Sequence, residues 1–134
     1  FEFCAIGCGL PIALGAKVAQ PQRPVVALCG DGGFLLNSSE LATAVQEQID
    51  VIIILFNDAA YTAVRKTQHL LYDDRYIATK LRGPDFVALA QAFGARGTRA
   101  HSAAELQKAV RAALQSGGTT LIEVPLPPWP WSSD

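Results

Sequence analysis

Two short polar strings, each at the end of an apolar run, are the residues of this chain best suited to chemistry. Gly30-Asp31-Gly32-Gly33 follows the apolar run 25–29, and Asn57-Asp58 follows the apolar run 51–56. A carboxylate beside bare backbone N–H groups suits a hard cation that is bridged to a phosphate. The two strings therefore predict a site for a phosphate and a divalent metal.

The spacing of the two aspartates predicts that they meet. Asp31 and Asp58 are 27 residues apart, the length of one strand-helix-strand unit. In open α/β sheets ligands bind at the carboxyl edge, where both residues are expected. Two carboxylates that close repel each other unless a cation or a proton lies between them. Gly32 and Gly33 leave the backbone N–H groups accessible, and the helix expected after Asn37 adds its dipole. The predicted ligand is a diphosphate with Mg²⁺ or Ca²⁺.

A Gly-Asp-Gly string alone is also typical of a surface turn. The second acidic strand end at Asn57-Asp58 argues against that interpretation, because a simple turn does not account for it.

Apolar spacing and turn signals predict strands that alternate with helices. The expected strands cover residues 25–29, 51–56, 96–100 and 119–124, and the expected helices cover 10–20, 38–48, 60–71, 84–93 and 102–117. Residues 72–83 are expected to form a loop. Helix caps are predicted at Ser38 or Ser39 and at Ser102, where Glu105 would complete a capping box. This order predicts an α/β fold with a doubly wound, mostly parallel sheet and helices on both faces.

Composition excludes several functional classes. The chain has 134 residues, of which 50% are hydrophobic and 17% charged, and a formal net charge of −1. It has no basic stripe, which argues against nucleic acid and anionic membrane surfaces, and no apolar run long enough to span a bilayer. Three cysteines favour a reducing, cytoplasmic compartment, with Cys4 and Cys8 as ordinary buried thiols rather than half of a metal site. The start at Phe1, without Met, suggests a truncated single domain over residues 1–134.

In order along the chain, several segments resemble one family. Gly30-Asp31-Gly32 followed by Asn57-Asp58 resembles the thiamine-diphosphate motif, in which GDG precedes NN. Residues 6–16, 57–61 and 119–125 are similar to segments of the superfamily of acetolactate synthases, benzoylformate decarboxylases and pyruvate decarboxylases. The resemblance covers almost the whole chain. It implies the C-terminal diphosphate-binding domain of such an enzyme, with thiamine diphosphate and Mg²⁺ or Ca²⁺ as cofactors.

The resemblance also implies roles for single residues. The metal ligands would be Asp31, Asp58 and the backbone carbonyl of Ala60. Asp58 replaces the usual Asn, which adds a negative charge and leaves the preference between Mg²⁺ and Ca²⁺ open. Ile6 would lie under the cofactor and bend it, and the Cys4 carbonyl would accept from its amino group; the alternative is that both are core residues. The implied cofactor-binding residues are Cys4, Ile6, Gly30, Asp31, Gly32, Gly33, Asp58, Ala60 and Tyr61.

Substrate choice is expected on the helix after Asp58, where Ala63 and Val64 would face the reacting carbon. Val64 stands where pyruvate decarboxylases carry a catalytic Glu, so the pocket looks closer to the benzoylformate-decarboxylase type. Thr67 stands where plant and fungal acetolactate synthases carry a Trp. These residues imply a decarboxylase of branched or aromatic 2-oxo acids. The alternatives are an acetolactate-synthase-like carboligase, a non-catalytic thiamine-diphosphate-binding module and, with least support, a flavodoxin-like phosphate binder.

Other polar residues receive a simpler interpretation. Arg65, Lys66 and Gln68 are expected on a solvated helix face, and His69 and His101 are expected to be structural or surface residues.

No residue of the chain matches the Glu by which the pyrimidine-binding domain of this superfamily activates the cofactor. The resemblance therefore implies a partner domain from the same or a neighbouring subunit, in a homodimer or homotetramer that acts on a 2-oxo acid. This chain alone is expected to be inactive and to expose apolar surface where the partner packs, and no catalytic side chain is assigned within it because the activating Glu is absent.

Overall fold

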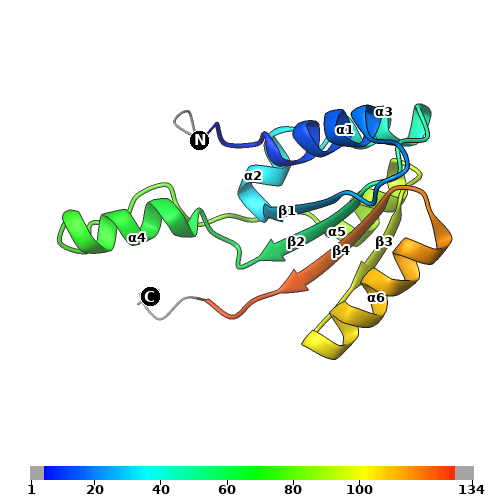
Figure 1. Cartoon of the computed structure of the whole chain (residues 1–134). Coiled ribbons are helices and arrows are strands. Elements are labelled where there is room, and N and C mark those ends of the chain that lie inside the picture. Colours follow the sequence, from blue (N-terminus) through cyan, green and yellow to red (C-terminus); the bar gives the residue numbers. More distant parts are fainter. Residues whose placement is uncertain (1–4, 129–134) are drawn as a thin grey trace.

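The computed structural model describes residues 5–128, which form one parallel sheet with its helices (Figure 1). Cys4, for which a cofactor contact is predicted, lies outside the described residues. The four strands are β1 (Val26–Gly30), β2 (Ile52–Asn57), β3 (Arg96–Arg99) and β4 (Thr120–Pro125). The six helices within this range are α1 (Gly9–Ala19), α2 (Asp31–Leu36), α3 (Glu40–Gln46), α4 (Thr62–Leu71), α5 (Phe86–Ala92) and α6 (Ala103–Ser116).

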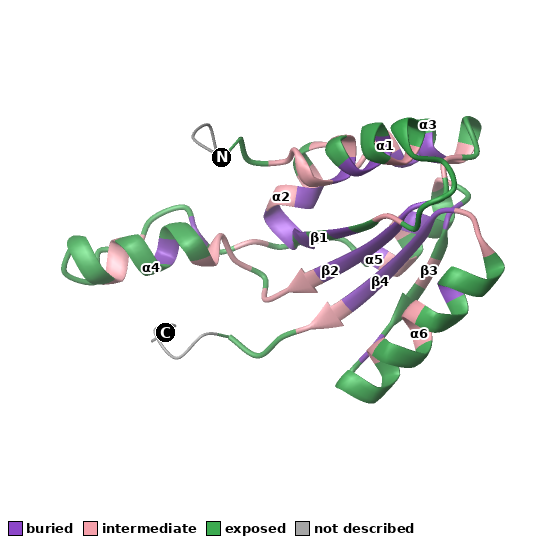
Figure 2. Ribbon diagram, viewed as in Figure 1, coloured by how far each residue is buried: buried purple, intermediate pink, exposed green. Residues whose placement is uncertain are grey.

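All strand pairs of the sheet are parallel, in the order β1-β2-β4-β3. β2 and β4 occupy the centre, and the first four residues of each are buried. Figure 2 shows both strands in the colour of buried residues up to their arrowheads. Continuous apolar runs such as 51–56 suit strands that are covered on both faces. The predicted doubly wound α/β fold is confirmed.

Helices cover the two faces of the sheet unequally. On one face, side chains of α1, α2, α3 and α5 form the larger core cluster, which includes Leu10, Phe34, Leu41 and Phe86. On the other face, α6 packs over β2 and β4 through Ala113 and its neighbours. No helix of the described segment is long and apolar enough to cross a membrane.

α2 was not expected, because the sequence pattern predicts no helix between residues 30 and 37. Two glycines within Asp31–Leu36 disfavour a helix, but Phe34 is 2% exposed and packs edge-on against Phe86, with ring centroids 6.0 Å apart. Tertiary burial thus outweighs local propensity. The helix dipole nearest Asp31 is therefore that of α2, and not that of the helix predicted after Asn37.

The predicted caps are confirmed in part. The Ser102 hydroxyl accepts from the N–H of Glu105, whereas the Glu105 carboxylate accepts from the N–H of His101. Ser39 precedes α3 but its side chain makes no capping bond, and the Ser38 hydroxyl donates to the Leu35 carbonyl. The preceding α2 explains this difference, because it brings the chain into α3 with helical rather than extended backbone at Ser39.

α4 projects away from the sheet, and the following segment runs back along it to its base (Figure 1). There the Tyr61 N–H donates to the Thr79 carbonyl at 2.8 Å, and the Leu81 N–H donates to the Ala59 carbonyl at 2.8 Å. We call these two hydrogen bonds the neck. Residues 72–83 form the predicted loop, and the neck fixes its C-terminal part, at Thr79 and Leu81, against the β2–α4 turn.

The prediction that Arg65 lies on a solvated helix face is wrong. The Arg65 side chain is buried, and its guanidinium carbon lies 4.4 Å from the centroid of the Tyr76 ring. Tyr76 belongs to the loop that follows α4 and runs back along it. Tyr76 in turn donates to Asp74 at 2.5 Å, and Asp74 lies 2.5 Å from the Nδ1 atom of His69. His69 therefore has a structural role, as expected.

Candidate diphosphate and metal site

A cavity of about 260 Å³ lies at the carboxyl edge of β1 and β2. Every predicted site residue within the described part of the chain lines it. Its lining comprises Ile6, Gly30, Asp31, Gly32, Gly33, Phe56, Asp58, Ala60, Tyr61, Thr62, Ala63 and Val64. The structure thus brings together residues from three separate stretches of sequence, and their individual roles stay predictions.

Asp31 is the buried acid of this cavity. It directly follows β1, begins α2 and is 2% exposed, and its Oδ2 atom has no hydrogen-bond partner. Burial raises the pKa of its carboxyl, the charge of Asp58 raises it further, and the backbone N–H groups of Gly32 and Ala59 act in the opposite direction. A buried carboxylate oxygen without a partner calls for an explanation, and a cation ligand provides one.

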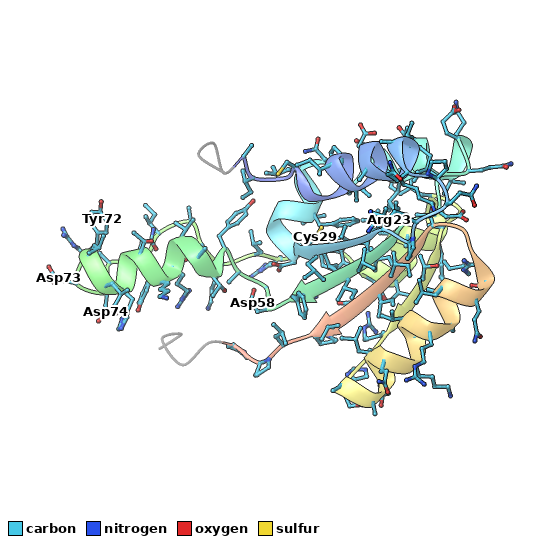
Figure 3. The ribbon with its side chains drawn as sticks, in the orientation of Figure 1. Arg23, Cys29, Asp58, Tyr72, Asp73 and Asp74 are labelled. Carbon is cyan, nitrogen blue, oxygen red and sulfur yellow. The ribbon has the colours of Figure 1, made fainter. Side chains whose placement is uncertain are left out.

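Asp58 lies just beyond the end of β2, whereas Asp73 and Asp74 lie at the far tip of α4 (Figure 3). The Oδ2 atom of Asp58 accepts a hydrogen bond from the hydroxyl of Thr62, the first residue of α4. The hydroxyl therefore orients the second carboxylate, a contact that was not predicted although the spacing of four residues allowed it.

The glycines of the cavity differ in what surrounds them. A Cβ atom on Gly32 would lie 2.3 Å from the Tyr61 ring and 2.7 Å from Leu81, so the ring covers this residue. A Cβ atom on Gly30 would meet nothing within 4 Å, and one on Gly33 would approach Ile6 only to 3.8 Å. Gly30 and Gly33 therefore border open space in which a ligand can approach the backbone.

The donor atoms fit a hard divalent cation. Between residues 5 and 128 no three side chains of His, Cys, Asp or Glu cluster around one point. A metal here would thus be held by the carboxylates of Asp31 and Asp58, the Ala60 carbonyl and oxygens of a bound phosphate. An all-oxygen set of this kind suits Mg²⁺ or Ca²⁺ rather than zinc.

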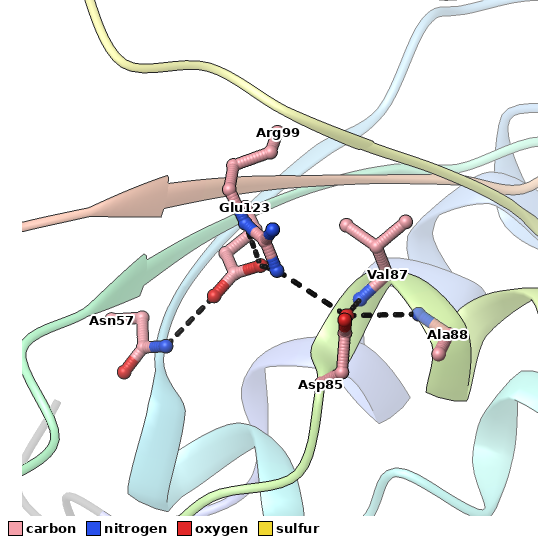
Figure 4. A network of polar contacts seen from close by, with 6 residues as sticks. All are labelled: Asn57, Asp85, Val87, Ala88, Arg99 and Glu123. Atoms are coloured by element: carbon pink, nitrogen blue, oxygen red, sulfur yellow. Dashed lines mark hydrogen bonds and ion pairs between the residues drawn. The ribbon is translucent and has the colours of Figure 1, made fainter.

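An ionic network centred on the buried Glu123 supports the turn that carries Asp58 (Figure 4). Glu123 of β4 is 3% exposed and accepts from Asn57 at 2.8 Å and from Arg99 at 2.7 Å. Arg99 also contacts Asp85, whose carboxylate caps α5. This network was not predicted; its one signal in the sequence is a single acidic residue, Glu123, inside the apolar strand 119–124.

A larger groove of about 610 Å³ lies between β3 and α6. Arg96, Arg99 and Lys108 line it together with one carboxylate, that of Glu105. It contains none of the predicted site residues and no acidic pair, so we assign the candidate site to the smaller cavity.

The cysteines within the described residues are free thiols. Cys29 is buried, and this burial raises the pKa of its thiol to about 11, so it stays protonated at neutral pH. Cys8 is half-buried. Cys4 lies outside the described residues, so the interpretation of Cys4 and Cys8 as ordinary buried thiols stays a prediction.

Comparison with known proteins identifies the family. Residues 2–124 match the family described as "Thiamine pyrophosphate enzyme, C-terminal TPP binding domain", where thiamine pyrophosphate is another name for thiamine diphosphate. The chain is 39% identical over 119 residues to the mitochondrial acetolactate synthase catalytic subunit of Aspergillus candidus. This match covers 89% of this chain and 17% of that protein. The chain is 38% identical over 120 residues to the acetolactate synthase isozyme 2 large subunit of Escherichia coli, and this match covers 89% of this chain and 22% of that protein.

A solved structure agrees with these matches. The thiamine diphosphate-dependent 4-hydroxybenzoylformate decarboxylase of Rhodococcus jostii superposes with a TM-score of 0.86 at 37% identity, over 92% of this chain and 23% of that one. The chain thus spans only about a fifth of the length of these relatives. The chain belongs to the thiamine pyrophosphate enzymes, as their C-terminal thiamine-pyrophosphate-binding domain.

Proposed function

We propose that this chain holds the diphosphate and divalent-metal end of thiamine diphosphate within a 2-oxo acid decarboxylase of benzoylformate-decarboxylase-like type. The observation that carries this proposal is the unpartnered, buried Oδ2 atom of Asp31 in the cavity that Asp58 also lines. Bound Mg²⁺ or Ca²⁺ would pair with both carboxylates and relieve their repulsion. The family match supports the identity of the cofactor.

Different residues of the chain would bind the metal, the phosphate groups and the rings of the cofactor. Asp31, Asp58 and the Ala60 carbonyl would hold the metal, while Gly30 and Gly33 would present backbone N–H groups to the phosphate oxygens. Ile6, which is 58% exposed at the rim of the cavity, would support the cofactor rings. Thiamine diphosphate, when bound, supplies a carbanion centre that attacks the carbonyl of a 2-oxo acid and stabilises the charge left by loss of CO₂.

The apolar pocket wall supports the decarboxylase assignment. Ala63 and Val64 line the same cavity as Asp31, and neither carries a proton-transfer group. Such a wall suits a branched or aromatic 2-oxo acid. The solved decarboxylase structure, at 37% identity, supports the same class.

An acetolactate-synthase-like carboligase is the second candidate, because curated relatives at 38–39% identity carry that name. The two activities differ in their products. The complete protein that contains this chain would release an aldehyde as a decarboxylase, and a longer 2-hydroxy-3-oxo acid as a carboligase. Product analysis with pyruvate and with benzoylformate separates them.

We also propose that a pyrimidine-binding domain, from the same or a neighbouring subunit, completes the site in a homodimer or homotetramer. Large apolar side chains are exposed on the outer face of β1 and along α4, a pattern that marks an interaction surface. They include Val26, Leu28, Val64, Leu70 and Leu71.

Calorimetric titration of thiamine diphosphate tests the cofactor assignment. We expect binding in the presence of Mg²⁺, no binding with chelator, and loss of binding in Asp31→Asn. Asp73→Asn is the matched control, because it removes a similar charge at the far tip of α4. Failure of the complete, folded protein to bind with either Mg²⁺ or Ca²⁺ would refute the proposal.

A further inference from the structure

Glu123 carries a buried charge in the middle of the sheet. Its side chain is 4% exposed, and its register partners are Leu55 on β2 and Arg99 on β3. A buried carboxylate is costly unless its oxygens are paired, and both are. Oε2 accepts from the Nε atom of Arg99 at 2.8 Å, and Oε1 accepts from the Nδ2 atom of Asn57 at 2.8 Å.

The bond to Asn57 fixes which way the Asn57 amide points. An amide has one donor end and one acceptor end, and a carboxylate takes only the donor end. The acceptor Oδ1 atom is thereby directed to the N–H of Ala59, at 3.2 Å. Ala59 has a φ of 56°, a left-handed conformation that non-glycine residues adopt only when the surroundings hold them there.

This chain of contacts ends at the predicted metal ligands. Asp58 lies between Asn57 and Ala59, and the Ala60 carbonyl follows immediately. Glu123 touches neither of these two residues in the contacts described above, yet it sets the backbone from which both ligands project. The Arg99 side of the carboxylate leads instead to Asp85 and the start of α5 (Figure 4), and neither Arg99 nor Asp85 lines the cavity.

We propose that Glu123 is a positioning residue that acts through Asn57 to hold the 58–60 turn in the geometry required by Mg²⁺. This inference rests on the proposed function. Mg²⁺ demands a near-ideal octahedron with bonds of about 2.0–2.1 Å, whereas Ca²⁺ accepts irregular geometry at about 2.3–2.6 Å. A turn that loses its support therefore loses affinity for Mg²⁺ more than for Ca²⁺. A carboxylate that only stabilised the fold would change both affinities alike.

The test compares three variants in the complete protein that contains this chain. Glu123→Gln keeps the shape but removes the charge that orients the Asn57 amide. Asn57→Ala breaks the same link and leaves the Arg99 pair in place. Glu105→Gln is the matched control, because that carboxylate also accepts a hydrogen bond, from the N–H of His101 at 2.8 Å, but lies on α6 outside the cavity. Thiamine diphosphate binding is titrated with Mg²⁺ and separately with Ca²⁺.

We expect Glu123→Gln and Asn57→Ala to raise the half-saturating Mg²⁺ concentration about 10-fold or more, the size found when groups behind metal ligands are removed. The half-saturating Ca²⁺ concentration should rise several-fold less, and Glu105→Gln should change neither. In the double variant the loss should not exceed that of the worse single variant, because both changes break one path.

Three outcomes decide the inference. Equal changes for Mg²⁺ and Ca²⁺, or no change, in folded Glu123→Gln and Asn57→Ala would overturn it and leave the proposed function intact. If Glu123→Gln does not fold, Asn57→Ala alone decides, since it retains the Arg99–Glu123 pair. Absence of binding in the unaltered protein with either metal would overturn the proposed function itself, which separates the two failures.

Discussion

Asp31 and Asp58 lie just past the ends of two adjacent parallel strands, and the charge of Asp58 adds to the effect of burial in raising the pKa of the Asp31 carboxyl. The two carboxylates that are proposed to bind the metal thus repel each other when no cation is bound. This conflict has measurable consequences for stability and for pH dependence.

Asp31→Asn should stabilise the cofactor-free protein near neutral pH. Folding raises the pKa of Asp31, so its favourable contribution is complete below the unfolded-state pKa and is lost as pH rises through the folded-state pKa. Asn removes the buried charge, which we expect to increase the free energy of unfolding by about 1–3 kcal/mol at pH 8. The gain should vanish below about pH 4, where the carboxyl is protonated in both states.

Urea unfolding from acidic to alkaline pH measures this difference. Asp73→Asn should show no comparable gain. Equal stability of Asp31→Asn and the unaltered protein at pH 8 would contradict the argument.

Asp58→Asn restores the residue usual in the resembling family and removes the like charge next to Asp31. The pKa of Asp31 should fall, because Asp58 raises it. Metal binding needs ionised Asp31, so the pH midpoint of Mg²⁺-dependent cofactor binding should move to lower pH. At neutral pH affinity should stay within about tenfold, since the charge count of the ligands tunes affinity without creating the site. An unchanged pH midpoint would show that the two carboxylates are not coupled.

Gly30→Ala and Gly32→Ala should separate cofactor binding from stability. A methyl group on Gly32 would overlap the Tyr61 ring, so we expect a loss of about 1–3 kcal/mol in the free energy of unfolding. A methyl group on Gly30 meets only open space and should cost under about 1 kcal/mol, but it would occupy the approach to the phosphate. Chemical unfolding and calorimetry on both variants test this, and full cofactor affinity in Gly30→Ala would count against the assigned location of the phosphate.

Asp85→Ala should lower the thermal midpoint while cofactor affinity is kept. The Asp85 carboxylate accepts from the N–H groups of Ala88 and Val87, and the Ala88 bond is the main cause of its lowered pKa. Its contribution is present above the unfolded-state pKa and is lost as pH falls through the folded-state pKa, so the variant and the unaltered protein should converge in acid. Asp85→Asn, which keeps a cap, should retain most of the stability.

The strands and the location of the site were predictable because their signals are local. Continuous apolar runs predict β1, β2 and β4, and parallel topology then brings Asp31 and Asp58 to one edge. The features that were missed depend on contacts between distant residues. The hydrogen bond between Asn57 and Glu123 joins residues 66 positions apart. α2 forms because Phe34 packs against Phe86, which lies far away in the sequence. Burial of Arg65 likewise depends on the loop that returns Tyr76 to α4.

The neck has a consequence for how sequences of this kind can vary. Its two backbone hydrogen bonds, from Tyr61 to Thr79 and from Leu81 to Ala59, close the excursion that contains α4. Backbone pairing does not depend on side-chain identity, and the entropic cost of closing a loop grows only slowly with its length. The segment between the two hydrogen bonds, α4 and the loop after it, can therefore change in length or in its apolar side chains while the turn at its base keeps its shape. Under the proposed function, changes at Ala63 and Val64 would therefore alter substrate preference without moving Asp58 and the Ala60 carbonyl.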